Sequence, residues 1–147
     1  MLIPDLNLLI YAYNADAPHH EAARAWWEAC LSGQEEVGLP WAVLHGFMRL
    51  MTHRRVLEQP LRPDDVIAIE SSWLERDNAF ILQPGDRHFR IWSELLSALG
   101  IAGKLTTDSH LAALAIEHRA ELHSNDGDFA RFRELRWHNP LRAAKRD

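Results

Sequence analysis

Cysteine is almost missing from this sequence of 147 residues, since Cys30 is the only one and no disulfide can form within the chain. Its apolar neighbours favour a small buried side chain over a reactive thiol. Long apolar runs are missing as well, because none approaches the roughly 18 residues of a membrane-spanning helix. The first residues also lack the basic stretch of a secretion signal. We therefore expect a cytoplasmic protein.

Positive charge is scarce, with 16 Lys and Arg against 21 Asp and Glu and a net charge of -5. A protein of this sign does not hold nucleic acid by its overall field, so any such contact must be local. Basic residues do cluster at 53–55 and again at Arg142, Lys145 and Arg146. Short charge runs are more often solvated surface, so these two clusters alone indicate little.

Internal repeats, low-complexity tracts and Gly/Ser-rich linkers are also absent from the sequence. With 47% hydrophobic residues, a chain of this length can bury a core of ordinary size. We therefore interpret residues 1–147 as a single domain.

Short apolar runs bounded by turn residues predict four strands, at residues 2–4, 37–40, 79–82 and 121–124. Apolar positions at helical spacing predict helices between them, at residues 20–31, 43–51, 63–74, 89–99 and after Asp108. Strands that alternate with helices of this length predict an α/β fold whose short parallel sheet is covered on both faces. The expected architecture is therefore three-layered, α/β/α.

Four aspartates follow predicted strands or open a predicted helix. Asp5 ends the first strand, Asp126 and Asp128 follow the last one, and Asp108 stands at the start of an alanine-rich helix. Ligands of parallel sheets bind beyond the carboxyl ends of the strands, so these distant residues can meet there. Each aspartate also has an ordinary explanation: a helix N-cap for Asp5, the helix dipole for Asp108, and turn chemistry for the other two. No single aspartate decides between the two readings.

Taken together, these aspartates within one α/β unit resemble the PIN domains of the VapC toxin type. Asp5-Leu6-Asn7 is similar to the Asp-x-Asn signature of that family, and Lys104 stands where the family commonly has asparagine. The other matching segments are Phe47-x-Arg49, Arg54-Arg55-Val56, Thr107-Asp108, Asp126-Gly127-Asp128-Phe129 and Asn139-Pro140-Leu141. The resemblance covers nearly the whole chain and implies a PIN-like fold.

The resemblance further implies a Mg²⁺-dependent endoribonuclease, the toxin of a type II toxin–antitoxin system, with Mn²⁺ as a substitute ion. Such an enzyme hydrolyses RNA phosphodiester bonds with a metal-activated water. Mg²⁺ takes oxygen ligands, so Asp5, Asp108 and Asp126 are the expected catalytic metal ligands. Asp128 is a weaker ligand candidate, and Asn7 is an orienting group. The implied partners are an RNA substrate, a cognate VapB-type antitoxin whose tail covers the acidic rim, and a second copy in a homodimer.

The main departure from the family lies at Gly46, where aligning Phe47-x-Arg49 places a residue that is usually glutamate. His45 is no substitute, because adjacent helical residues point about 100° apart and imidazole is a poor Mg²⁺ ligand. We expect His45 in the core or at the surface. Because an acid is missing, a second hypothesis stays open: a non-catalytic PIN-like module that binds RNA or protein. A third, a structure-specific DNA nuclease, shares the same metal chemistry.

Two further groups of residues are considered for contacts with partners. Arg49, Arg54 and Arg55 are candidates for phosphate contacts, although solvated arginines are common. Most of the six tryptophans fit helical stripes, which favours the core or an oligomer interface over base-stacking platforms. Among them, Trp27 and Trp41 are the candidates for a dimer interface.

Overall fold

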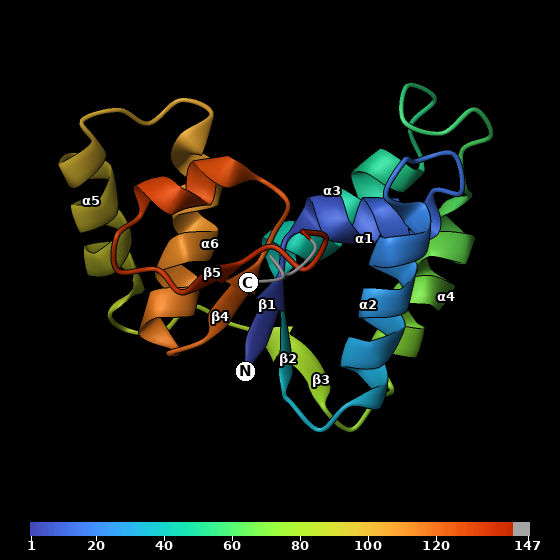
Figure 1. Cartoon of the computed structure of the whole chain (residues 1–147), viewed down its shortest axis with the longest axis horizontal. Helices are drawn as coiled ribbons and strands as arrows, with labels where there is room; N and C mark the ends of the chain where they lie inside the picture. The colour runs from blue at the N-terminus through green and yellow to red at the C-terminus, as the bar shows by residue number, and fades with distance from the viewer. Residues whose placement is uncertain (143–147) are drawn as a thin grey trace, which may run out of the picture.

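The computed structural model describes residues 1–142, so Lys145 and Arg146 of the expected basic cluster lie outside the described residues. Five strands form one parallel sheet in the order β3-β2-β1-β4-β5 (Figure 1). They are β1 (Leu2–Pro4), β2 (Val37–Pro40), β3 (Ala79–Leu82), β4 (Glu121–His123) and β5 (Trp137–His138). The four expected strands are confirmed, and β5 is an addition at the edge.

The first strand of the chain lies at the centre of the sheet. β1 pairs on one side with β2, with Leu2 opposite Val37, and on the other side with β4, with Pro4 opposite His123. Proline has no N–H to donate, but the N–H of the next residue, Asp5, donates to the His123 carbonyl oxygen at 2.8 Å. The ends of β1 and β4 are therefore held side by side.

Helices cover both faces of the sheet, which confirms the expected three layers. They are α1 (Leu6–Tyr13), α2 (His20–Ser32), α3 (Trp41–Met51), α4 (Pro63–Leu74), α5 (His88–Leu99), α6 (Leu105–Glu117) and the 3-10 helix η1 (Gly127–Arg131). α1, α2 and α4 lie to one side, at the right of Figure 1, and α5 and α6 lie to the other. α3 contacts both α1 and α4. The expected helices are confirmed, while α1 and η1 were not predicted.

Aromatic side chains fill the core between α1, α2, α3 and α4. The Trp73 ring centroid lies 5.4 Å from that of Trp27 and 4.8 Å from that of Phe47, and Trp73 Nε1 donates to the Tyr13 hydroxyl at 2.8 Å. Trp27 is only 2% exposed. The expectation that Trp27 lies at a dimer interface is therefore wrong, because this side chain is used inside the protomer, whereas Trp41 is 46% exposed.

Small residues bring α6 close to the sheet. Ala112, Ala113 and Ala115 are completely buried, and α6 contacts β4 directly. The preceding helix α5 ends at Gly100, whose φ of 71° is the left-handed conformation that glycine adopts without strain. Within residues 1–142, no helix has the length and hydropathy to cross a membrane.

Candidate active site

The expected aspartates gather at the carboxyl ends of the two central strands. Asp5 follows β1, and the segment from Ser124 to Asp128 follows its neighbour β4. Because Pro4 is paired with His123, the first and last parts of the chain meet at this edge of the sheet (Figure 1). Asp108 joins them from the first turn of α6. The helix begins at Leu105, one turn earlier than expected, so Asp108 lies within the helix instead of before it.

Three of the four aspartates form one compact group. One carboxylate oxygen each of Asp108, Asp126 and Asp128 lie within 4.8 Å of one another, and all three side chains are half-buried. Asp126 is the N-cap of η1, and its Oδ1 accepts the backbone N–H of Asp128 at 2.9 Å. The Nζ of Lys104 lies 3.9 Å from Oδ2 of Asp128. The first turn of α6 and the segment after β4 thus supply this cluster together.

Asp5 lies beside this group and is more deeply buried, at 8% exposure. Its Oδ1 accepts the backbone N–H of Leu6 at 2.8 Å, which makes Asp5 the N-cap of α1. Its Oδ2 accepts the hydroxyl of Ser124 at 2.7 Å. Burial raises the pKa of Asp5, and the negative charge of Asp126 raises it further. The two readings of Asp5 from the sequence are thus compatible: it caps a helix and it faces the other carboxylates.

Ser124 connects the two strand ends, and sequence reasoning assigned it no role. Besides donating to Asp5, its hydroxyl oxygen accepts the backbone N–H of Asp126 at 3.0 Å and Asn7 Nδ2 at 3.3 Å. The side chain is completely buried. The only available signal was a serine at the end of a predicted strand, and serine is common where strands lead into turns.

Asparagines form the next layer around the carboxylates. Asn7 Oδ1 accepts the backbone N–H of Asn125 at 3.4 Å, and Asn139 Nδ2 donates to Oδ1 of Asn125 at 2.9 Å. Trp137 Nε1 donates to the carbonyl oxygen of Ser124 at 3.0 Å. These contacts connect the loop after β4 to α1 and to the segment of β5.

The electrostatics of the cluster suit a cation. Burial and then the charges of Asp5, Asp126 and Asp128, in that order, together raise the pKa of Asp108 to about 6, against a lowering by Lys104. Carboxylates at this spacing repel each other unless a proton or a metal ion lies between them. Carboxylate oxygens are hard donors of the kind that bind Mg²⁺ or Mn²⁺. The donor set is therefore compatible with the divalent ion that the resemblance implies.

Because metal binding requires ionised carboxylates, we expect Mg²⁺ affinity to depend on pH around the pKa of Asp108, about 6. Above this pH Asp108 is charged and the affinity is constant. Below it the ion must displace a proton, so the affinity falls by up to about tenfold per pH unit. Calorimetric titration with Mg²⁺ at pH 5.0, 6.0 and 7.5 measures this. Equal affinities at pH 5.0 and 7.5 would contradict it.

Position 46, where the family usually has glutamate, packs against the side chain of Leu6, which a larger residue would have to displace. Gly46 is buried in α3, and a Cβ atom added to it would lie 2.5 Å from Cδ2 of Leu6. The glycine thus allows α3 to approach α1 closely. His45 is exposed on α3, as expected, with its ring centroid 5.4 Å from that of Trp41. Within residues 1–142, the group of three acidic residues contains no member from α3.

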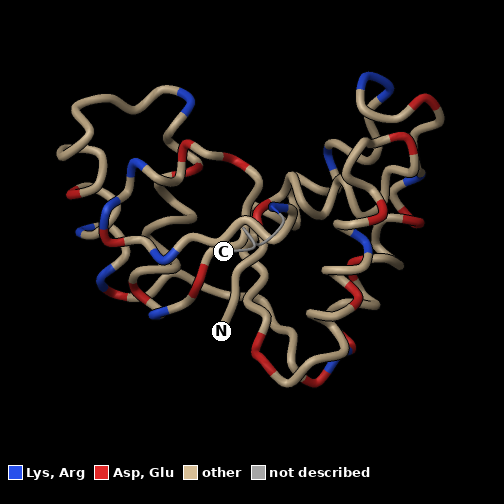
Figure 2. The backbone as a smooth tube through the Cα atoms, viewed as in Figure 1, with Lys and Arg blue, Asp and Glu red and all other residues tan. Residues whose placement is uncertain are grey.

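The candidate phosphate contacts lie away from the carboxylate group. Arg49 is in the last turn of α3, and Arg54 and Arg55 are exposed in the loop that joins α3 to α4. Basic residues on this loop are visible at the upper right of Figure 2, across the strand ends from the basic residue in the loop before α6. Positive charge therefore stands on both sides of the acidic strand ends.

Comparison with known proteins gives consistent matches over nearly the whole chain. A family model described as PIN domain matches residues 2–135. Ribonuclease VapC33 of Mycobacterium tuberculosis is 48% identical over 97% of this chain and 99% of its own length. Ribonuclease VapC37 of the same organism is 39% identical over 95% of this chain and 97% of its own length.

Solved structures share the fold at lower identity. VapBC2 from Rickettsia felis, bound to a DNA fragment from its promoter, matches with a TM-score of 0.69 and 20% identity, over 94% of this chain and 97% of that one. Mycobacterium tuberculosis VapC20, a sarcin-ricin loop cleaving toxin, matches with a TM-score of 0.61 and 18% identity, over 92% and 99% of the two chains. By its sequence, its sheet and its near full-length relatives, the chain belongs to the PIN-domain family, as a ribonuclease of the VapC type.

Proposed function

We propose that this chain is a Mg²⁺-dependent endoribonuclease, the toxin of a type II toxin–antitoxin system, and that Asp5, Asp108 and Asp126 are its catalytic residues. The observation that carries the proposal is the meeting of Asp108, Asp126 and Asp128 within 4.8 Å, next to Asp5, from opposite ends of one PIN domain. The relatives named ribonucleases support RNA as the substrate.

The residues of the site have different roles in this proposal. A bound Mg²⁺ supplies an acidified water and offsets the charge of the scissile phosphate. Asp108 of α6 and Asp126 and Asp128 at the start of η1 would hold this ion. Asp5 contributes to the same site, because each carboxylate oxygen has a lone pair left after one hydrogen bond. Ser124 and Asn7 hold Asp5 and the loop after β4 in fixed relative positions, so the carboxylates are positioned before RNA binds.

The direct test is cleavage of a mixed RNA pool by the purified protein with Mg²⁺, with Mn²⁺ and with EDTA, beside single-stranded DNA of matched sequence. We expect cleavage of RNA with either ion and none with EDTA. RNA binding without cleavage at any ion concentration would favour the non-catalytic module, for which Gly46 in place of the family's glutamate is the specific argument. Equal cleavage of the DNA would favour the DNA nuclease.

An antitoxin of the VapB type is the proposed protein partner. The acidic cluster is a site for a basic side chain, which would replace the metal ion and neutralise the carboxylates. The match to VapBC2 of Rickettsia felis supports a partner of this class. Inhibition of this kind would require no conformational change in the toxin.

The proposed homodimer has a candidate interface on α3 and α5. Phe89 is 73% exposed and Trp41 is 46% exposed. A hollow of about 370 Å³ is lined by Ala42 of α3 together with Phe89 and Trp92 of α5. Large exposed apolar side chains that adjoin a hollow are typical of protein interfaces.

Phe89→Glu is therefore expected to convert a dimer to a monomer, because a charge at the centre of an apolar contact is left without a partner. Analytical ultracentrifugation measures this at micromolar concentration. Ile67→Glu is the control, because Ile67 is an exposed apolar residue of α4 on the other side of the sheet. An unchanged sedimentation coefficient for Phe89→Glu would mean that the dimer interface lies elsewhere. A monomeric wild type would mean that there is no dimer.

A further inference from the structure

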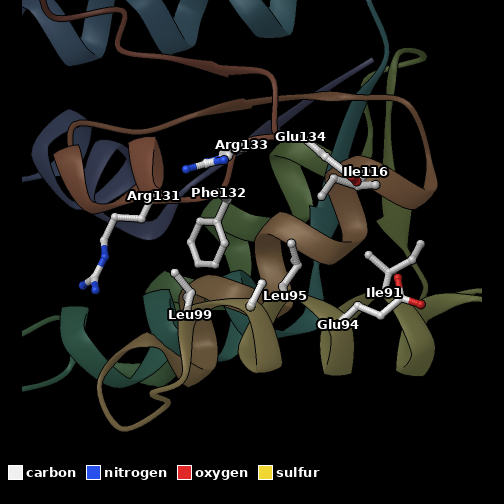
Figure 3. A pocket seen from close by; sticks show the side chains of 10 residues that line it. Ile91, Glu94, Leu95, Leu99, Ile116, Arg131, Phe132, Arg133 and Glu134 are labelled. Carbon is white, nitrogen blue, oxygen red and sulfur yellow. The ribbon is translucent and has the colours of Figure 1, made fainter.

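A second hollow lies away from the dimer candidate and from the carboxylates, between α5, α6 and the chain that leaves η1. It has a volume of about 710 Å³. Ile91, Leu95 and Leu99 of α5 and Ile116 of α6 line it, and Phe132 points into it from the segment after η1 (Figure 3). The lining side chains are mostly aliphatic, so the hollow suits bulky apolar groups.

Charged side chains stand at the two ends of this hollow. In Figure 3, the guanidinium groups of Arg131 and Arg133 lie toward the end marked by Leu99, and the carboxylates of Glu94 and Glu134 lie toward the opposite end. All four are exposed, and none of them forms a salt bridge with another group in residues 1–142. The hollow thus offers one basic end and one acidic end.

The basic end is linked to the acidic cluster by η1. Asp126 caps this helix and Arg131 is its last residue, so the two lie about 10 Å apart along a 3-10 helix that rises about 2 Å per residue. A single extended segment of a few residues spans that distance. One partner chain can therefore occupy the hollow and reach the carboxylates.

Two features argue for a peptide over RNA as the occupant. Glu94 and Glu134 would repel a phosphate backbone, whereas a peptide can carry charges of both signs. Phe132 is only 3% exposed, so the hollow has no aromatic face on which a base could stack. The aliphatic lining is suited instead to Leu, Ile or Phe side chains of a peptide.

We infer that this hollow is the second docking site of the antitoxin, which rests on the proposed toxin function. The docked segment has bulky apolar residues in the hollow, an acidic side chain against Arg131 and Arg133, and a basic side chain against Glu94 and Glu134. A further basic side chain follows beyond the acidic residue, at a distance that reaches the carboxylate cluster. The charge order of the partner segment is thus specified by the hollow and the cluster together.

The test measures the affinity of the proposed cognate VapB-type antitoxin for the full-length toxin, by biolayer interferometry at 0.1 M and 0.4 M salt. Arg131→Glu/Arg133→Glu is expected to weaken binding at least tenfold, with most of the loss removed at high salt. The control Arg54→Glu/Arg55→Glu makes the same change of charge on an exposed pair, and the affinity should stay within threefold.

A filling variant tests the apolar part without removing a native contact. Ala98 lines the hollow and is exposed. Ala98→Phe should therefore fill the hollow and lower the affinity for the antitoxin at least tenfold. Ala68→Phe is the control, at an exposed alanine of α4. Wild-type affinity in both Ala98→Phe and Arg131→Glu/Arg133→Glu would overturn the inference.

RNA cleavage by the same variants separates this inference from the proposed function. We expect Arg131→Glu/Arg133→Glu and Ala98→Phe to cleave RNA at the wild-type rate. If the variants cleaved RNA ten times more slowly and bound the antitoxin with wild-type affinity, the hollow would be an RNA-binding site and the inference would be wrong. If the wild-type protein cut no RNA, the proposed function would fail, while the affinities would still decide whether the hollow docks the partner.

Discussion

Asp108→Asn is expected to lower the rate of RNA cleavage about a thousandfold while the protein remains folded. A metal ion contributes several kcal/mol of transition-state stabilisation, and each 1.36 kcal/mol corresponds to about tenfold in rate. Asparagine has nearly the same shape as aspartate but no charge, so it binds the ion poorly. The measurement is single-turnover cleavage of a labelled RNA at saturating Mg²⁺.

Two further readings complete this experiment. The melting temperature of metal-free Asp108→Asn should equal or exceed that of the wild type, since the substitution relieves the repulsion from Asp5, Asp126 and Asp128 that raises the pKa of Asp108. Asp64→Asn is the control, because Asp64 also lies in the first turn of a helix but is exposed on α4. Full cleavage by Asp108→Asn would refute the assignment of the site.

Ser124→Ala is expected to cost about 2 to 4 kcal/mol of unfolding free energy, because the buried oxygen of Asp5 left without a partner costs about 1 to 3 kcal/mol and the two half-buried partners add about 1 kcal/mol. The alanine would leave the backbone N–H of Asp126, the amide of Asn7 and one oxygen of Asp5 without the partner they share. Urea denaturation measures the loss. Cleavage should fall as well, since Asp5 and the loop of Asp126 are no longer tied together.

Ser109→Ala is the matched control for this variant. Ser109 is equally buried and lies next to Asp108, but its hydroxyl makes one hydrogen bond, to the carbonyl oxygen of Thr106 at 2.8 Å. The expected cost is about 1 kcal/mol. Equal costs for the two serines would show that Ser124 does not act as the connection between the strand ends.

The strands and most helices were predictable because their local patterns agree with the fold. The run Val37-Gly38-Leu39-Pro40 is buried at every position, as expected of a strand covered on both faces. The convergence of Asp5 with Asp126 followed from the parallel sheet alone, since both come after central strands. These predictions needed only periodicity and the rules of sheet topology.

Other features depend on contacts between distant residues, which no local pattern records. α1 is apolar on nearly all sides, so its sequence has no helical stripe, and its start depends on the cap at Asp5. β5 has only two residues, too few for a local pattern, and it is defined by its pairing with β4. The hydrogen bonds of Ser124 reach across the whole sequence, and Gly46 is explained only by the side chain of Leu6.

The central position of β1 has a consequence for the synthesis of the chain. β1 leaves the ribosome long before its partner β4, and Asp5 meets Asp126 only after these strands pair. Pairing over such a separation is slow to form and closes late. A nascent or prematurely ended chain without β4 therefore has no assembled carboxylate cluster. We therefore expect the proposed nuclease site to form only after β4 has been synthesised.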